Sequence, residues 1–266
     1  MIINYKRIFL DSQNRINAFW KIFGLFVLIF ILTRVLYFIS HKLSIPQNWQ
    51  NSFAILGTII FTFIFIKVVD RRPLKEFGFY FKKYTSFVLL LGLICFPLAI
   101  YFTYAVIICP LYTLNVQILK DGIFGSAILV SLIQNTIVAL NEELIFRAYI
   151  ITNIKNKVIA LIVSTFLFAI SHTGFSISSY VYLILFGVFF FFIYVRFGIY
   201  LAILIHLLNN WVSGMFYLTP VNLLNQNVFL TETITAVGRI VIFLLLFFLI
   251  KNVITRIRET RGKVFA

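Results

Sequence analysis

Long apolar stretches constrain this chain more than any other feature of its sequence. A helix needs about 20 apolar residues to cross roughly 30 Å of hydrocarbon at 1.5 Å per residue. Windows near that length fall at 22–39, 53–69, 87–109, 124–145, 158–170, 178–195, 200–218 and 234–254, the fifth being short. Helices satisfy their own backbone groups in lipid. We therefore predict an all-α, polytopic membrane bundle of about eight transmembrane helices, with residues 1–266 forming a single integral membrane domain.

The basic residues predict how the chain is oriented. Its net charge of +15 comes from 23 Lys and Arg against 8 acidic residues. The basic residues gather in alternate loops, such as the one with Arg71 and Arg72 and the one with Lys155 and Lys157, and such loops stay on the cytoplasmic side. We interpret the charge as a topology signal in contact with a lipid bilayer, and expect no nucleic acid partner. Both termini should be cytoplasmic in a multi-pass plasma membrane protein, and the short loops favour a prokaryotic source.

Several polar side chains lie where lipid would penalise them, which makes a shared purpose the best interpretation. Glu142 and Glu143 end the fourth window, and His172 and His206 follow on other predicted helices. If the fourth helix continues past Arg147 to the basic loop, Glu142 lies about 18 Å from that end. His172 lies up to about 22 Å along the fifth helix from the same loop, and His206 about 15 Å along the seventh, counted from Arg196. Three helices would thus bring them to comparable depth.

Helical spacing predicts which of these side chains meet. Glu143 and Arg147 are four residues apart and can pair along one helix face, with Glu142 turned about 100° away. His206 and Asn210 are also four apart and share a face, whereas Asn209 should point elsewhere. Structural roles are the alternative for each residue, since a buried histidine is often only hydrogen-bonded to a backbone carbonyl.

Three motifs in this part of the chain resemble those of the CAAX-protease and bacteriocin-processing membrane proteins, the CPBP or Abi family. They are Glu-Glu-x-x-x-Arg at 142–147, Phe-x-x-x-His at 168–172 and His-x-x-x-Asn at 206–210. Each pattern alone is weak, but all three in order on predicted membrane helices are specific. The resemblance covers a family-like core at about 124–218.

The resemblance implies an intramembrane endopeptidase similar to type II CAAX prenyl endopeptidases. Glu142 would be the general base that activates water, and His172 would help to position that water. His206 and Asn210 would form the oxyanion hole, while Glu143 and Arg147 would give structural support. Hydrolysis without a covalent intermediate needs such a base and such donors. The expected partner is a peptide or protein substrate, such as a bacteriocin or signalling-peptide precursor cut near the cytoplasmic face.

Other functions remain open from the sequence. No cofactor is expected, but Glu142, His172 and His206 could instead bind zinc with one position open for water, although the chain has no His-Glu-x-x-His helix. A non-catalytic bacteriocin-immunity or scaffold protein is the competing class. A transporter is weaker, because the polar pattern is not repeated.

Overall fold

The fold was analysed in a computed structural model of the chain. The structure describes residues 16–81, 112–115, 126–172, 177–215 and 217–220, together with a few positions between 86 and 94 and between 237 and 252. Residues 16–81 form the first two long helices and the loop after them. Residues 126–215 carry the three motifs.

Six apolar helical segments make up the described bundle. The first two are α2 (Ala18–Lys42) and α3 (Gln47–Phe65), which continues into the π-helical turn η1 (Ile66–Asp70). The third is one uninterrupted helix made of α5 (Ser126–Glu142), the π-helix η5 (Glu143–Tyr149) and α6 (Ile150–Asn153). The others are α7 (Lys157–Ile170), α8 (Ile177–Phe197) and α9 (Ile199–Met215). A short 3-10 helix, η2 (Leu74–Phe77), follows η1.

Asparagine side chains begin two of these helices. The Asn17 Oδ1 atom accepts a hydrogen bond from the backbone N–H of Phe19 at 3.0 Å, at the start of α2. At α7, Asn156 Oδ1 accepts from Val158 and Ile159 at 2.9 and 3.1 Å. Each cap satisfies N–H groups that the first turn of a helix leaves without a partner.

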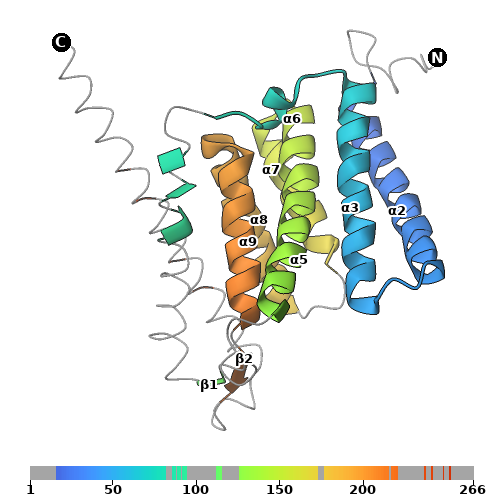
Figure 1. Cartoon of the computed structure of the whole chain (residues 1–266). Helices are drawn as coiled ribbons and strands as arrows, with labels where there is room; N and C mark the ends of the chain where they lie inside the picture. The colour runs from blue at the N-terminus through green and yellow to red at the C-terminus, as the bar shows by residue number, and fades with distance from the viewer. Residues whose placement is uncertain are drawn as a thin grey trace, which may run out of the picture.

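The helices pack so that the motif-bearing segments meet. Helix α3 lies between α2 and α5, α9 packs on both α5 and α8, and α7 packs on α8 (Figure 1). The π-helix η5 contacts α7, α8 and α9. All seven of its residues are buried, and so are Ile150 and Ile151 after it. The centre of the core is therefore the segment that begins with the first motif.

The described helices confirm the all-α membrane class. Four segments are long and apolar enough to cross a membrane: Ala18–Lys42, Gln47–Asp70, Leu129–Asn153 and Ser179–Phe197. The segments Lys157–Ile170 and Ile199–Trp211 are shorter apolar helices. Large apolar side chains also cover the outside, such as Phe38 at 65% exposure, as expected of a lipid-facing surface. The predicted windows 87–109 and 234–254 lie largely outside the described residues.

One predicted boundary is wrong. The seventh window was expected to run to 218, but α9 ends at Met215, and Tyr217–Pro220 forms the strand β2. It pairs antiparallel with β1 (Tyr112–Asn115), with Tyr112 opposite Pro220. Pro220 restricts Thr219 to extended backbone, which suits the strand. The prediction that the fourth helix continues past Arg147 is confirmed by its end at Asn153.

At two glycines, the loop after η1 contacts the turn between α8 and α9. Gly78 and Gly198 have φ angles of +86° and +87°, a region that side chains with a Cβ rarely adopt. A Cβ on Gly198 would lie 3.1 Å from the carbonyl oxygen of Gly78. That same oxygen accepts a hydrogen bond from the backbone N–H of Ile199 at 3.3 Å. The loop therefore meets the first turn of the helix that carries His206.

Candidate active site

The first motif lies where the long third helix changes from α to π geometry. Helix α5 ends at Glu142, η5 begins at Glu143, and the N–H of Ile150 bonds to the carbonyl of Ile145, five residues back. Bonds of this span widen the helix and reduce the rotation between successive side chains, and such bulges are frequent at functional sites. The two neighbouring carboxylates therefore both reach α9.

Glu143 is fully buried between two nitrogen bases. Its Oε1 atom accepts a hydrogen bond from Nδ1 of His206 at 2.7 Å, and its Oε2 atom lies 3.4 Å from Nε of Arg147. The side chains of Glu143, Arg147 and His206 are 0%, 1% and 3% exposed. The predicted pairing of Glu143 with Arg147 is present. Its contact with His206 was not expected from the sequence.

The Arg147 guanidinium is enclosed by aromatic rings. Its Cζ atom lies 4.2 Å from the centre of the Phe168 ring and 5.2 Å from that of Phe190. The negative faces of such rings stabilise a desolvated cation, which makes the site suited to arginine. Phe168, the first residue of the second motif, also packs edge-on against the His172 ring at 4.8 Å.

Glu142 lies between both histidines. Its Oε1 atom is 3.7 Å from Nε2 of His172, and its Oε2 atom is 3.5 Å from Nε2 of His206. Glu142 and His172 are 17% and 22% exposed, in contrast to the buried Glu143 and His206. The site thus has a partly exposed side, where Glu142 and His172 lie, and a buried side formed by Glu143, Arg147 and His206.

Hydrogen bonds on the far side of each ring fix which histidine nitrogen carries a proton. Nδ1 of His172 lies 2.8 Å from the carbonyl oxygen of Phe168, which can only accept, so that Nδ1 donates. Nδ1 of His206 donates to the Glu143 carboxylate in the same way. In the neutral form of each ring, Nε2 then presents a lone pair toward Glu142. At 3.5 and 3.7 Å these contacts are longer than ordinary hydrogen bonds.

Asn210 is held by its neighbour in the chain. Its Oδ1 atom accepts a hydrogen bond from Nδ2 of Asn209 at 3.2 Å, and Asn209 Oδ1 accepts from the Tyr182 hydroxyl at 3.4 Å. With its oxygen engaged, the Asn210 amide has its NH₂ group left to donate. The described contacts bring Glu142, Glu143, Arg147, His172 and His206 together, whereas the hydrogen bond of Asn210 goes to Asn209. No described contact of Asn209 goes to the carboxylates or histidines of the centre, and its hydrogen bond to Asn210 was not predicted from the sequence.

Among the residues that the structure describes, no group of three or more histidine, cysteine, aspartate and glutamate side chains has the arrangement of a metal site. The donor types of Glu142, His172 and His206 are nonetheless ones that zinc accepts. Both Nε2 lone pairs and the carboxylate converge from three helices.

The helical bundle and this buried carboxylate and histidine centre define a class of protein, a multi-pass membrane protein with a polar site enclosed by its helices. Residues 124–212, about a third of the chain, match the family model described as type II CAAX prenyl endopeptidase Rce1-like. All three motifs fall within that segment, so the resemblance read from them is confirmed. This segment is thus similar to the type II CAAX prenyl endopeptidases.

A bacterial relative is similar over a shorter stretch. UPF0177 protein YxdF of Lactococcus lactis subsp. lactis (strain IL1403) is 53% identical over 53 residues, which are 20% of this chain. The aligned segment spans 30% of the length of that relative. The similarity is consistent with the same family and carries no statement about a substrate.

Proposed function

We propose that this protein is an intramembrane endopeptidase that hydrolyses a peptide bond with water activated by Glu142. The observation that carries the proposal is the Glu142 carboxylate between the Nε2 atoms of His172 and His206, at 3.7 and 3.5 Å, on the partly exposed side of the site. A buried structural carboxylate would be expected to bind its donors directly, as Glu143 does at 2.7 Å. Glu142 instead lies beyond ordinary hydrogen-bond distance of both Nε2 atoms, so its carboxylate oxygens are available to take a proton from water.

In this mechanism a water lies beside the Glu142 and His172 side chains, within hydrogen-bond distance of both. One of its protons points to Oε1 of Glu142 and the other to Nε2 of His172, which leaves an oxygen lone pair for the carbonyl carbon of the substrate. As the C–O bond forms, Glu142 takes a proton and the carbonyl oxygen becomes negative. When the C–N bond breaks, Glu142 returns that proton to the leaving amine, so that the carboxylate is restored.

His206 and Asn210 would stabilise the negative oxygen. For Nε2 of His206 to donate, its ring must be protonated on both nitrogens, because Nδ1–H is already bonded to Glu143. The Asn210 NH₂ group would supply the second donor.

The substrate in this proposal is a peptide or protein precursor cut at the cytoplasmic side of a plasma membrane. The CAAX-type match supports a peptide substrate, and the basic residues Lys155 and Lys157 support the orientation. A bacterial relative supports a prokaryotic membrane, where a bacteriocin or signalling-peptide precursor is a suitable class of substrate.

Glu142→Gln is the direct test, because it keeps the size of the side chain and removes the base. Purified protein in liposomes would be incubated with candidate precursor peptides, and the products mapped by mass spectrometry. We expect cleavage to fall by at least about 100-fold, while Glu76→Gln, a change in an exposed glutamate paired with Arg72, leaves it unchanged. Undiminished cleavage by a folded Glu142→Gln variant would refute the mechanism.

The zinc mechanism is the alternative that the converging Nε2 lone pairs favour. Glu142, His172 and His206 would hold the ion after drawing closer together, and zinc would polarise the attacking water. Elemental analysis separates the two mechanisms. We expect less than stoichiometric zinc and activity that survives a chelator. Stoichiometric zinc that is lost together with activity would establish the alternative.

The same Glu142→Gln variant also tests an immunity or scaffold role. If cells carrying it keep the protection or other phenotype of the natural protein although cleavage is lost, binding rather than hydrolysis is the biological role. Loss of both together supports the peptidase.

A further inference from the structure

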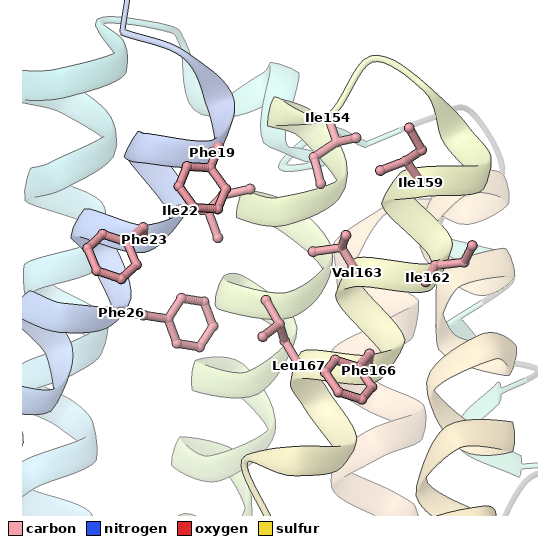
Figure 2. A pocket seen from close by; sticks show the side chains of 10 residues that line it. All are labelled: Phe19, Ile22, Phe23, Phe26, Ile154, Ile159, Ile162, Val163, Phe166 and Leu167. Carbon is pink, nitrogen blue, oxygen red and sulfur yellow. The ribbon is translucent and has the colours of Figure 1, made fainter. Parts of the chain in front are cut away.

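An apolar groove opens on the outside of the bundle between α2 and α7, away from the carboxylate and histidine centre. Its walls include Phe19, Phe23 and Phe26 of α2 and Ile159, Ile162 and Phe166 of α7, and its volume is about 590 Å³. Figure 2 shows these side chains facing one another across the gap, with Ile154 at its upper end. Several remain exposed, Phe19 and Ile162 at 61% each.

The chemistry of the groove suits a hydrocarbon chain. All ten residues that line it are phenylalanine, leucine, isoleucine or valine. A peptide laid in it would bring N–H and C=O groups that need partners, and these walls offer none. An acyl chain needs no such partner and gains from apolar contact alone.

A polar pocket of about 600 Å³ adjoins the groove at the same end and shares Ile154 and Ile159 with it. Its charged lining consists of Lys21, Asp70, Arg72, Glu76 and Lys155. Two of the bases are already paired, Lys21 with Asp70 at 2.7 Å and Arg72 with Glu76 at 2.6 Å. Lys155 has no carboxylate partner within the described part of the chain, so the charged side chains that line the pocket have one positive charge in excess.

Neutral donors complete the polar pocket. Asn156 lines it and uses Oδ1 to cap α7, which turns its NH₂ group to other acceptors. Asn17 also lines the pocket and caps α2 in the same way. A pocket lined by an uncompensated lysine and two amides is suited to an anionic oxygen group.

We propose that the groove and the adjoining pocket together bind one anionic membrane phospholipid, with its phosphate at Lys155 and Asn156 and an acyl chain between α2 and α7. The pocket lies at the helix ends near the loop 154–156, and the groove runs from it along the membrane-facing side of the bundle. This is the order in which a phospholipid presents its headgroup and its chain.

The bound chain would also support the centre mechanically. The Phe26 ring on the groove wall lies 6.0 Å from the ring of Phe146 in η5, and Phe146 lies 5.5 Å from Phe168, which covers Arg147. A lipid in the groove would hold α2 against η5 without reaching the reactive groups. The site is therefore separate from the proposed peptidase centre.

Lipid retention measures this site directly. Purified protein would be equilibrated in mixed micelles with phosphatidylglycerol and phosphatidylcholine of the same acyl chains, and the retained lipid identified by native mass spectrometry. We expect a preference for phosphatidylglycerol of about fivefold, the scale of one basic residue near anionic lipid. Lys155→Glu should abolish the preference, as should the milder Lys155→Gln, whereas Lys157→Glu, a neighbouring exposed lysine outside the pocket, should keep it.

A second pair of variants tests whether the groove binds the acyl chain. Ile159→Trp should fill the junction of groove and pocket and lower retention of both lipids, whereas Ile60→Trp, at a similarly exposed isoleucine on α3, should not. Equal retention of the two lipids by the natural protein, or equal loss with Lys157→Glu, would overturn the proposal. It would also fail if Ile159→Trp left lipid retention intact but abolished binding of a lipidated peptide, since the groove would then belong to a substrate.

The result is independent of the proposed peptidase activity. Glu142→Gln should retain phosphatidylglycerol as the natural protein does, because no lining residue of the groove or pocket belongs to the centre. Loss of cleavage and loss of lipid binding can therefore be told apart.

Discussion

At the scale of single residues, the position of Glu143 is unusual because one buried carboxylate serves two bases. It receives the Nδ1–H of His206 and lies beside Arg147, with no exposed surface of its own. A buried charge is costly unless it is paired, and removing one partner leaves the others unbalanced. Glu143 thus determines both the stability of the core and the proton on His206.

Glu143→Gln should destabilise the protein by about 3 kcal/mol, because the buried Arg147 cation loses its nearest carboxylate. Thermal unfolding in detergent micelles would measure the loss, with Glu76→Gln as a control whose half-exposed pair should be worth less than about 1 kcal/mol. The double variant Glu143→Gln, Arg147→Met should recover part of the stability, since it removes the unpaired cation as well. Additive losses in the double variant would mean that the pair is not coupled.

Residue spacing predicted much of this centre. The i, i+4 rule gave the Glu143 and Arg147 pair, and depth along three helices predicted that Glu142, His172 and His206 meet. The rule could not predict that Glu143 also binds His206, because two adjacent residues of an α-helix point about 100° apart. Nor could it show that Asn209 holds Asn210, since that contact depends on Tyr182 of another helix.

At the scale of secondary structure elements, the π-helix at Glu143–Tyr149 is the feature of the centre that residue spacing did not predict. It begins one residue after the end of α5 and so changes the direction of every side chain from the first motif onward. Apolar periodicity predicted the length of this helix but not its bulge, because neither propensity nor pattern distinguishes the two kinds of turn over seven residues. The two neighbouring carboxylates at the start of this segment both lie near the His206 imidazole.

Gly198→Ala should loosen the connection between the loop after η1 and helix α9. Alanine at this position would have to keep a left-handed backbone, at a cost of about 1–2 kcal/mol. Its Cβ atom would also lie only 3.1 Å from the Gly78 carbonyl oxygen. We expect a lower midpoint of thermal unfolding. Gly24→Ala, in α2 with open space around the added atom, should be neutral or stabilising by up to about 1 kcal/mol. Similar effects of the two substitutions would show that the glycine contact is not a constraint.

At the scale of the whole molecule, the helices confirm the class that the apolar windows predicted, while the side of the membrane on which each loop lies stays a prediction. The turn at 43–46 joins α2 and α3 at one end of the bundle, and the loop at 154–156 lies at the other (Figure 1). Only the second of these carries the basic residues of a cytoplasmic loop.

Single cysteines would determine the topology. In a background with Cys95 and Cys109 replaced by serine, Ser44→Cys should react with a membrane-impermeant maleimide in intact bacterial cells, and Lys155→Cys should react only after the cells are opened. Both positions are exposed, which makes them comparable. Labelling of Lys155→Cys in intact cells would show that the orientation is the reverse of the predicted one, with the proposed substrate outside the cell.

The shortness of α7 has a consequence for the surrounding bilayer. Fourteen residues rise about 21 Å, well below the roughly 30 Å of hydrocarbon that a full span covers, and the helix ends at the turn that carries His172. Lipids beside α7 must thin or tilt to match it, each at a modest cost in free energy. The thickness of the host membrane should therefore set how far water reaches toward Glu142, and short-chain lipids should ease the approach without any change in the protein.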